Sequence, residues 1–326
     1  MPGRRCPSVP ASPPRPRKAR DRSRRSRRSR ESRGSPRSSP CFAARESAIV
    51  QPSIGLSFKP QHFQQAMQAQ AQGLWFEVHP ENYMADGGPR PRMLAALAER
   101  HPVALHGVSL SLAGPEPLDL QHLRRLRHLI DRIKPVRLSE HLAWSRLGTR
   151  YVPDLLPAPR TRALLERVVA HVDQVQQLTG MRLALENPSH YLSLEGHEFS
   201  EAQFLNEVVR RTACSLLVDV NNLHVSAVNI QQHASDWLAE IDIEAISEIH
   251  LAGHSEDPEL GPRLLIDAHD RPVSEEVLAL YAALCQRIGP RPTLLEWDAD
   301  VPEFSVLWQE RERVQAATPA WSFAHD

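Results

Sequence analysis

Histidine and carboxylate side chains recur in this sequence directly after short apolar segments. Such a segment is typical of a buried parallel strand, and a polar residue at its end lies at one edge of the sheet. Imidazole and carboxylate groups that converge at a sheet edge can bind metal ions. Six successive strand ends supply such a group: His106, His141, Glu186, Asp219, His250 and Glu296. The sequence therefore predicts a metal centre built from several strands.

Further candidates flank these strand ends. Asp267 and His269 form an Asp-x-His pair, and side chains two residues apart on an extended segment point the same way. Asn222 could complete a site with that pair, and His224 competes with it for this role. The residues expected to orient the ligands or to contact a substrate are His79, Glu81, Glu140, Asn187 and His224.

A single histidine at a strand end is more often a hydrogen-bonded core residue than a metal ligand. Six such groups would each need a separate partner, because an unpaired buried polar group costs about 1–3 kcal/mol. Shared binding of metal ions explains all six at once. A mixed nitrogen and oxygen set without cysteine suits Fe(II), Mn(II) or Zn(II).

The elements that must position these groups alternate regularly between strand and helix. This alternation predicts a single (β/α)8 TIM barrel, whose functional groups lie at the C-terminal ends of its strands. Strands are expected at 54–58, 75–79, 103–108, 136–140, 183–186, 216–220, 248–251 and 293–296. Helices are expected at 61–72, 89–100, 119–133, 161–179, 200–211, near 230–240 and at 274–288, with long loops at 145–159 and 252–272.

The charge is distributed unevenly along the chain. Residues 1–47 contain 15 Lys and Arg against three acidic residues, a net charge of +12, whereas the remainder has 24 basic and 36 acidic residues, a net charge of −12. We expect residues 1–47 to be a disordered Arg/Ser/Pro-rich extension and residues 48–326 to form the barrel domain. The acidic barrel argues against nucleic acid as a partner.

The chain is expected to be cytoplasmic. Its cysteines lack paired spacing, and Cys214 and Cys285 fall in apolar segments, as buried thiols of a reducing compartment would. No apolar run reaches the length of a membrane span, so no membrane association is expected.

Eight motifs resemble those of a known enzyme family. In chain order they are EVHPENYM, LHGVSLSL, SEHLAW, ENPSHY, LLVDVNNLHVSAVN, EIHLAGH, LIDAHDRPV and LLEWD, within about residues 53–310. The order of the candidate ligands resembles that of the xylose-isomerase-like barrels, including endonuclease IV, except that Asn222 stands where that nuclease has histidine. The motifs themselves are more similar to the multinuclear non-haem iron-dependent oxidases, a group that includes the oxazolone-forming catalytic subunit of methanobactin biosynthesis.

This resemblance implies an oxidase with two or three irons, in mixed Fe(II) and Fe(III) states, that uses O2. Its substrate would be cysteine in a ribosomally made precursor peptide, converted for example to oxazolone and thioamide, and a separate partner protein would present the peptide. The implied ligands of the first iron are His106, His141 and Glu186. Those of the second are the bridging Glu186, Asp219, His250 and Glu296, and those of a third, more labile iron are Asn222, Asp267 and His269. The implied catalytic residues are Glu186, Asp219 and His250.

Three other functions fit the same barrel. A zinc-dependent DNA-repair endonuclease would need a basic surface, which the acidic barrel does not favour. A sugar isomerase or epimerase would use two divalent ions and a Glu or His base, and the number of histidines is high for that site. A barrel that only binds metal or a partner would not need so many convergent ligands.

Overall fold

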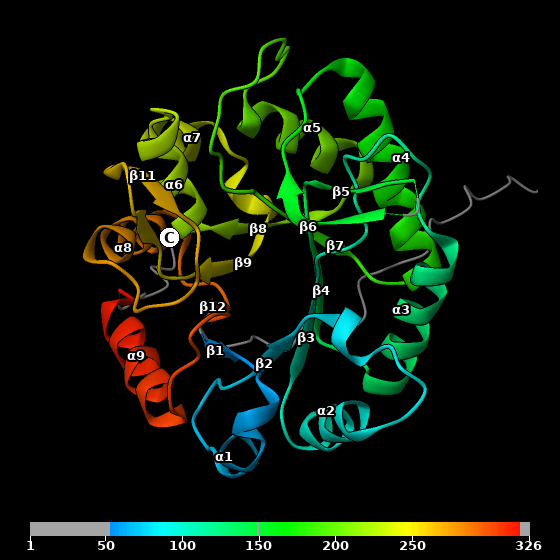
Figure 1. Ribbon diagram of the computed structural model, residues 1–326, viewed down its shortest axis with the longest axis vertical. Coiled ribbons are helices and arrows are strands. Elements are labelled where there is room, and N and C mark those ends of the chain that lie inside the picture. Colours follow the sequence, from blue (N-terminus) through cyan, green and yellow to red (C-terminus); the bar gives the residue numbers. More distant parts are fainter. Residues whose placement is uncertain (1–52, 149, 320–326) are drawn as a thin grey trace, which may run out of the picture. The chain divides into compact units, whose positions relative to one another are not determined.

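The computed structural model describes residues 53–148 and 150–319, which form a (β/α)8 barrel (Figure 1). Its parallel strands close in the order β1-β12-β9-β8-β7-β4-β3-β2. The predicted fold is therefore confirmed, whereas the prediction for residues 1–47 lies outside the described residues. The barrel strands are β1 (Ile54–Ser57), β2 (Phe76–Val78), β3 (Val103–Gly107), β4 (Arg137–His141), β7 (Leu183–Glu186), β8 (Ser215–Asp219), β9 (Ile246–Leu251) and β12 (Thr293–Leu295).

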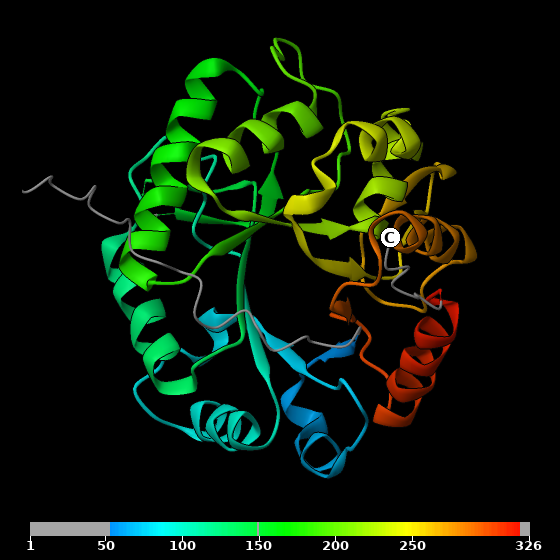
Figure 2. The same cartoon turned by 180° about the vertical axis from the view of Figure 1, so that it is seen from behind.

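The helices surround the barrel and cover the outer faces of its strands (Figures 1 and 2). Several begin at a side-chain cap: Asp119 accepts hydrogen bonds from two backbone N–H groups of α3, and Ser200 and Gln203 form a capping box at α5. The helices are α1 (Phe63–Gln68), α2 (Pro89–Arg100), α3 (Leu120–Ile133), α4 (Arg162–Thr179), α5 (Glu201–Thr212), α6 (Val220–Asn229), α7 (Ala234–Glu240), α8 (Glu275–Ile288) and α9 (Phe304–Ala317). None of the described helices is long and apolar enough to cross a membrane.

The predicted loops at 145–159 and 252–272 each contain an antiparallel ribbon, so those predictions were wrong. β5 (Trp144–Leu147) pairs with β6 (Arg150–Leu156), and β10 (Ser255–Asp257) pairs with β11 (Gly261–Ile266). Gly148 and Gly261 have φ of 59° and 57°, a region that glycine enters without strain. The glycines and prolines of these segments are typical of loops, so the short strands, which pair only within each ribbon, were not predicted. Both ribbons follow barrel strands and therefore belong to its C-terminal face.

The helix predicted near 230–240 is present as α7, whereas the helix that precedes it, α6, was not predicted. Helix α6 begins at Val220, immediately after β8, and α7 follows it. Asp219 ends the strand and caps the helix, because its side chain accepts a hydrogen bond from the Asn222 N–H at 2.7 Å. The three asparagines and three valines of α6 are weak helix formers, so the helix depends on this cap and on packing. The C-terminal helix α9 was not predicted.

Apolar and charged groups close the barrel interior beneath the strand ends. Trp75 packs with Ala104 and Leu294 in a cluster separate from the main core. Gly55 makes room for this indole, because a Cβ there would lie 2.3 Å from the Trp75 ring. The Arg137 guanidinium lies 4.0 Å from the centroid of the same ring. Two residues after Trp75, Ala104 and Leu294, the chain places polar side chains that lie above this layer. They are Glu77, His106 and Glu296.

Candidate metal centre

The first group of candidate ligands contains His106, His141 and Glu186. The Nε2 atoms of both histidines lie 3.0 Å from Glu186 Oε2. His106 Nδ1 is hydrogen-bonded to the Ser139 hydroxyl at 2.8 Å, and His141 Nδ1 to the Gly107 carbonyl at 3.0 Å. These bonds hold the Nδ1 protons and direct both Nε2 lone pairs toward one point, as in metal-binding histidines.

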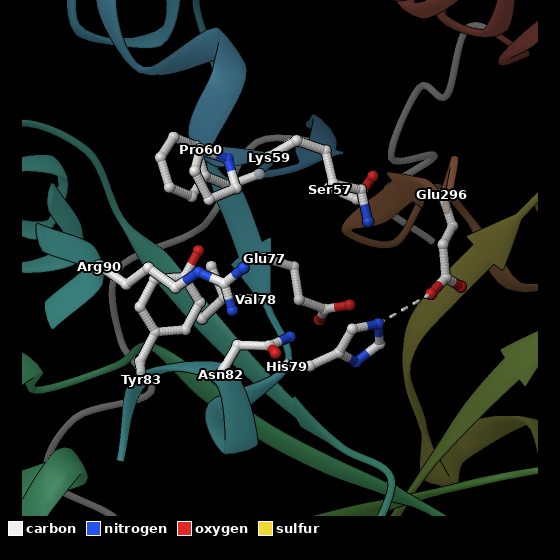
Figure 3. Close-up of a pocket in the computed structure, with 11 residues that line it drawn as sticks. Ser57, Lys59, Pro60, Glu77, Val78, His79, Asn82, Tyr83, Arg90 and Glu296 are labelled. Atoms are coloured by element: carbon white, nitrogen blue, oxygen red, sulfur yellow. Dashed lines mark ion pairs between the residues drawn. The ribbon is translucent and has the colours of Figure 1, made fainter. Parts of the chain in front are cut away.

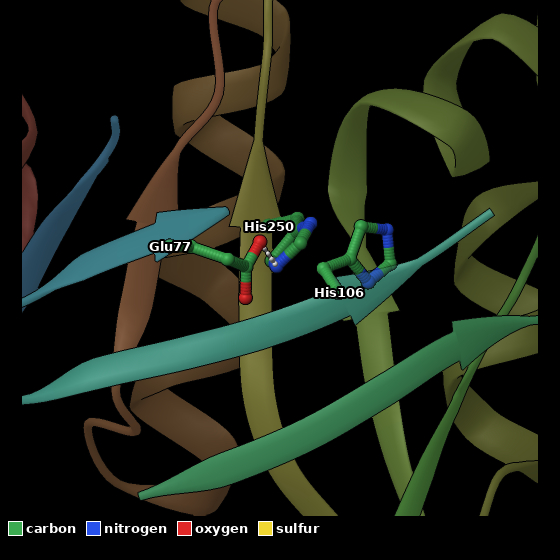
Figure 4. Close-up of side chains that lie close together, drawn as sticks. All are labelled: Glu77, His106 and His250. Atoms are coloured by element: carbon green, nitrogen blue, oxygen red, sulfur yellow. Dashed lines mark ion pairs between the residues drawn. The ribbon is translucent and has the colours of Figure 1, made fainter. Parts of the chain in front are cut away.

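The second group surrounds His250, which is fully buried. Its Nδ1 lies 3.3 Å from Glu296 Oε2 and 3.9 Å from Glu186 Oε1, and Asp219 completes the group. On the other side of the ring, Nε2 lies 3.3 Å from Glu77 Oε1 (Figure 4). An Nε2–H directed at Glu77 would leave Nδ1 free to bind metal. Glu186 thus belongs to both groups.

The third group lies at the rim of the barrel. His269, Asp219 and Glu296 offer ligand atoms within 4.8 Å of one another. Asp267 Oδ1 lies 2.7 Å from His269 Nε2 and accepts a hydrogen bond from the Asn221 amide at 2.7 Å. The structure therefore brings Asp267 and His269 together, as the Asp-x-His spacing predicted.

Asn187 connects the ends of strands β7 and β8. Its side-chain amide donates to the Asp219 carbonyl at 3.0 Å, and its side-chain oxygen accepts from the Asp219 N–H at 2.9 Å. The Asn187 carbonyl also accepts from the Asn222 amide at 3.0 Å. Asn222 Oδ1 remains buried without a hydrogen-bond partner among the described residues. Asn187 therefore holds Asp219 and Asn222 in position.

The predicted ancillary residues divide into two sets. His79 lies at the centre, with Nε2 4.0 Å from Glu296 and 3.7 Å from Asp298. Glu81 and Glu140 instead accept hydrogen bonds from the backbone N–H groups of Val108 and Leu110, at 3.1 and 3.4 Å. The ring of His224 lies 4.8 Å from that of His254, and neither belongs to the three groups above.

Glu140 is accommodated by a glycine on the neighbouring strand. A Cβ at Gly107 would lie 2.2 Å from Glu140 Oε2. Burial, reinforced by the nearby Glu81 carboxylate, raises the pKa of Glu140 to about 8. This carboxyl group is thus a neutral structural hydrogen-bonding group at neutral pH in the metal-free chain.

Two carboxylates at the centre, Glu77 and Asp298, were not predicted from the sequence. Glu77 is buried beside His250, and Asp298 Oδ2 lies 3.5 Å from His269 Nδ1. Both stand two residues from a group that the sequence had selected, His79 and Glu296 respectively. Since alternate residues of a strand share a face, this two-residue spacing was the available signal.

The centre is strongly anionic without a cation. Burial opposes the charge on His141, yet the adjacent Glu186 carboxylate raises the pKa of His141 to about 10. Burial also opposes the charge on His79, but Asp298 raises its pKa to about 9. Burial and repulsion by Glu186 raise the pKa of Asp219 well above its usual range. These pKa shifts all favour extra positive charge, which protons supply in the metal-free chain.

A cavity of about 200 Å³ adjoins the centre on the side of β1 and β2 (Figure 3). Glu77, His79 and Glu296 line its inner end. The remaining lining residues are Ser57, Phe58, Lys59, Pro60, Val78, Asn82, Tyr83 and Arg90. A substrate group in this cavity would lie directly beside the candidate metal ligands.

The fold and the ligand groups together define a class of protein: a xylose-isomerase-like TIM barrel with candidate metal-binding clusters at its strand ends. Residues 53–318 match the family described as the RiPP precursor modification enzyme MbnB/TglH/ChrH, where RiPP denotes a ribosomally synthesised and post-translationally modified peptide. The chain belongs to this family of precursor-modifying enzymes.

Curated relatives match most of the chain. A UPF0276 protein of Caulobacter sp. (strain K31) is 53% identical over 264 residues, which cover 81% of this chain and 95% of that protein. A UPF0276 protein of Bordetella bronchiseptica is 46% identical over 278 residues, covering 85% and 96%. Identity at this level extends over more than four fifths of the chain.

Solved structures share the fold at much lower identity. Endonuclease IV from Thermus thermophilus has a TM-score of 0.53 and 18% identity, covering 82% of this chain and 98% of that one. A xylose-isomerase-like TIM barrel protein from Mycobacterium smegmatis, in complex with magnesium, has a TM-score of 0.51 and 14% identity, covering 81% and 96%. These likenesses establish the barrel and carry no information on the reaction.

Proposed function

We propose that this protein is a multinuclear iron-dependent oxidase that uses O2 to modify cysteine in a precursor peptide. The observation that carries the proposal is the position of Glu186, whose carboxylate faces His106 and His141 through one oxygen and His250 through the other. Membership of the precursor-modifying family supports the peptide as substrate class.

The fit to metal ions rests on buried polar atoms that lack hydrogen bonds. Among the described residues, His106 Nε2 and Glu186 Oε2 lie 3.0 Å apart without the alignment of a hydrogen bond. Unsatisfied buried polar atoms are costly, and a cation would satisfy several at once. The other such atoms at the centre include Asp219 Oδ2, Asn222 Oδ1 and His250 Nδ1.

The proposed assignment follows the three groups. His106, His141 and Glu186 would hold one iron, and Asp219, His250 and Glu296 would hold a second, with Glu186 as the shared ligand. Asn222, Asp267 and His269 would hold the third ion. Of these, His269 belongs to the third group, in which Asp219 and Glu296 offer ligand atoms that would allow them to share the ion. The catalytic residues are Glu186, Asp219 and His250.

Bound iron would supply the one-electron chemistry with O2 and would lower the pKa of a substrate thiol. The chain contributes a centre enclosed by the barrel, and hydrogen bonds that fix the imidazoles before a substrate arrives. Removal of four electrons and four protons from the peptide balances the reduction of one O2 to two waters. A cysteine converted to oxazolone and thioamide is a product of this kind.

The peptide is proposed to arrive with a separate partner protein. The net charge of −12 outside residues 1–47 is compatible with a basic leader segment. The ribbons β5–β6 and β10–β11 belong to the face where the metal centre opens, so either could contact peptide or partner.

Metal analysis with Mössbauer spectroscopy would test the proposal first, on protein expressed with added iron and purified without oxygen. We expect two to three irons per chain and an O2-dependent mass loss in a cysteine-containing peptide encoded nearby. Tightly bound zinc without iron would overturn the oxidase and direct the search to hydrolytic or isomerase substrates.

A further inference from the structure

We propose that the cavity beside the metal centre binds a carboxylate group of the peptide substrate, with Arg90 as its counter-charge. This inference rests on the proposed function, because it assigns one part of that substrate. The cavity meets the centre at Glu77, His79 and Glu296, so a group bound there would lie next to the residue being modified.

Among the described residues, three hydrogen-bond donors of the cavity lining, on Arg90, Asn82 and Tyr83, have no side-chain partner. The side chains of Arg90 and Asn82 point toward it, and the Tyr83 ring lies beside the Arg90 side chain (Figure 3). Within the described residues, neither the Arg90 guanidinium nor the Tyr83 hydroxyl has a hydrogen-bond or ion-pair partner. Lys59, the other cation of the lining, is paired with Asp298. Arg90 is therefore available to a ligand.

Tyr83 keeps its proton throughout the neutral range. The residue is 3% exposed, and burial raises the pKa of its hydroxyl to about 12. A phenol that remains protonated can donate to an anion, as the Asn82 amide can. The cavity thus offers a guanidinium and two neutral donors.

The shape and charge of the cavity select a carboxylate on a short aliphatic stem. A guanidinium binds a carboxylate through two parallel hydrogen bonds. Phe58, Pro60 and Val78 supply an apolar wall for methylene groups. The acidic centre repels an anion when it is metal-free, so tight binding requires bound cations. Two sources offer this chemistry: an acidic side chain next to the modified cysteine, or the C-terminal carboxylate of the peptide.

Calorimetry on the metal-loaded full-length chain, without oxygen, would test this with two peptide pairs. One pair is acetyl-Gly-Cys-Glu-Gly-amide and its Gln counterpart, and the other is acetyl-Gly-Gly-Cys as free acid and as amide. We expect the acidic member of one pair to bind about tenfold more tightly than its neutral partner, and that pair identifies the source. Arg90→Gln should abolish the preference and Arg90→Lys should retain part of it.

Arg92→Gln is the matched control, because Arg92 belongs to the same helix and does not line the cavity. It should keep the full preference. Equal binding of acidic and neutral peptides by the unaltered chain, or a preference that survives Arg90→Gln, would overturn the inference. Both binding measurements can be made with zinc in place of iron. Their outcome is therefore independent of the iron content and of O2-dependent peptide modification, which test the proposed function.

Discussion

Two buried histidine–carboxylate assemblies among the described residues of the barrel differ in how completely their polar atoms are hydrogen-bonded. In the first, Glu201 accepts hydrogen bonds from His190 Nε2 at 2.6 Å and from Trp237 Nε1 at 2.8 Å, so both carboxylate oxygens are satisfied. In the second, at the candidate metal centre, Glu186 Oε2 and His250 Nδ1 are buried without hydrogen bonds among the described residues. Both assemblies bury a histidine beside a carboxylate. Only the candidate metal centre leaves polar atoms of these residues without hydrogen bonds.

Removing one carboxylate charge from each assembly should give the largest contrast. Glu186→Gln should lower iron content by at least one ion per chain and turnover by at least ~100-fold, because it removes a ligand shared by two groups. Elemental analysis and steady-state assays on the same preparation would measure both effects.

Glu201→Gln is the control for this experiment. It should leave iron content unchanged and lower the Tm by a few °C, since a charge-assisted hydrogen bond worth about 1.5–3 kcal/mol is weakened. Full iron and full turnover in Glu186→Gln would end the bridging assignment.

The third ion should be lost separately from the other two. Asp267→Asn removes the charge next to His269 at the rim, where the ligands are less enclosed. We expect one ion fewer per chain, with the remaining ions retained. Asp270→Asn, three residues away and paired with Arg271, should keep the full metal complement. Loss of all metal in Asp267→Asn would contradict three separable positions.

Sequence patterns predicted the barrel because each buried parallel strand is an apolar run that ends in a polar residue. They also predicted His106, His141, Glu186 and Asp219 at those ends, and the structure brings these groups together. The same reasoning missed Glu77, because it selected polar residues at strand ends, whereas Glu77 lies within β2 and was marked only by its two-residue spacing from His79. Its role depends on a partner across the barrel. His250 on β9 is that partner, and closure of the barrel alone makes them neighbours.

The ribbons and helix α6 were missed for a different reason. Gly148 marks the turn between β5 and β6, and a segment with a glycine and three prolines but no apolar alternation is typical of a loop. Helix α6 begins at a cap supplied by Asp219, a residue already selected as a metal ligand. Spacing in the sequence did not show that Asp219 is both a candidate metal ligand and the cap of a helix.

Glu77 should have a smaller effect than the direct ligands. Glu77→Gln keeps an oxygen that can accept from His250 Nε2–H but loses the charge that orients the ring, so we expect metal affinity to fall about 10–100-fold. Glu248→Gln is the comparison, because Glu248 pairs with Arg137 at 3.0 Å deeper in the barrel. It should reduce Tm and leave metal affinity near its original value. Competition with a chelator would measure the affinities, and equal affinities for both variants would refute the role of Glu77.

The smallest expected effect is on the pH dependence of two quantities: the stability of the metal-free chain and its affinity for metal. In the metal-free chain Glu186 raises the pKa of His141 to about 10, so their pairing stabilises the fold fully below the unfolded histidine pKa of about 6.5 and is lost as pH rises toward 10. Metal needs the neutral imidazole, so binding at pH 7 should release roughly one proton from this residue. Affinity should therefore rise with pH over the interval in which the metal-free fold loses stability. Calorimetry in buffers of different ionisation enthalpy would count the protons, and a heat independent of buffer would show that no histidine exchanges its proton for metal.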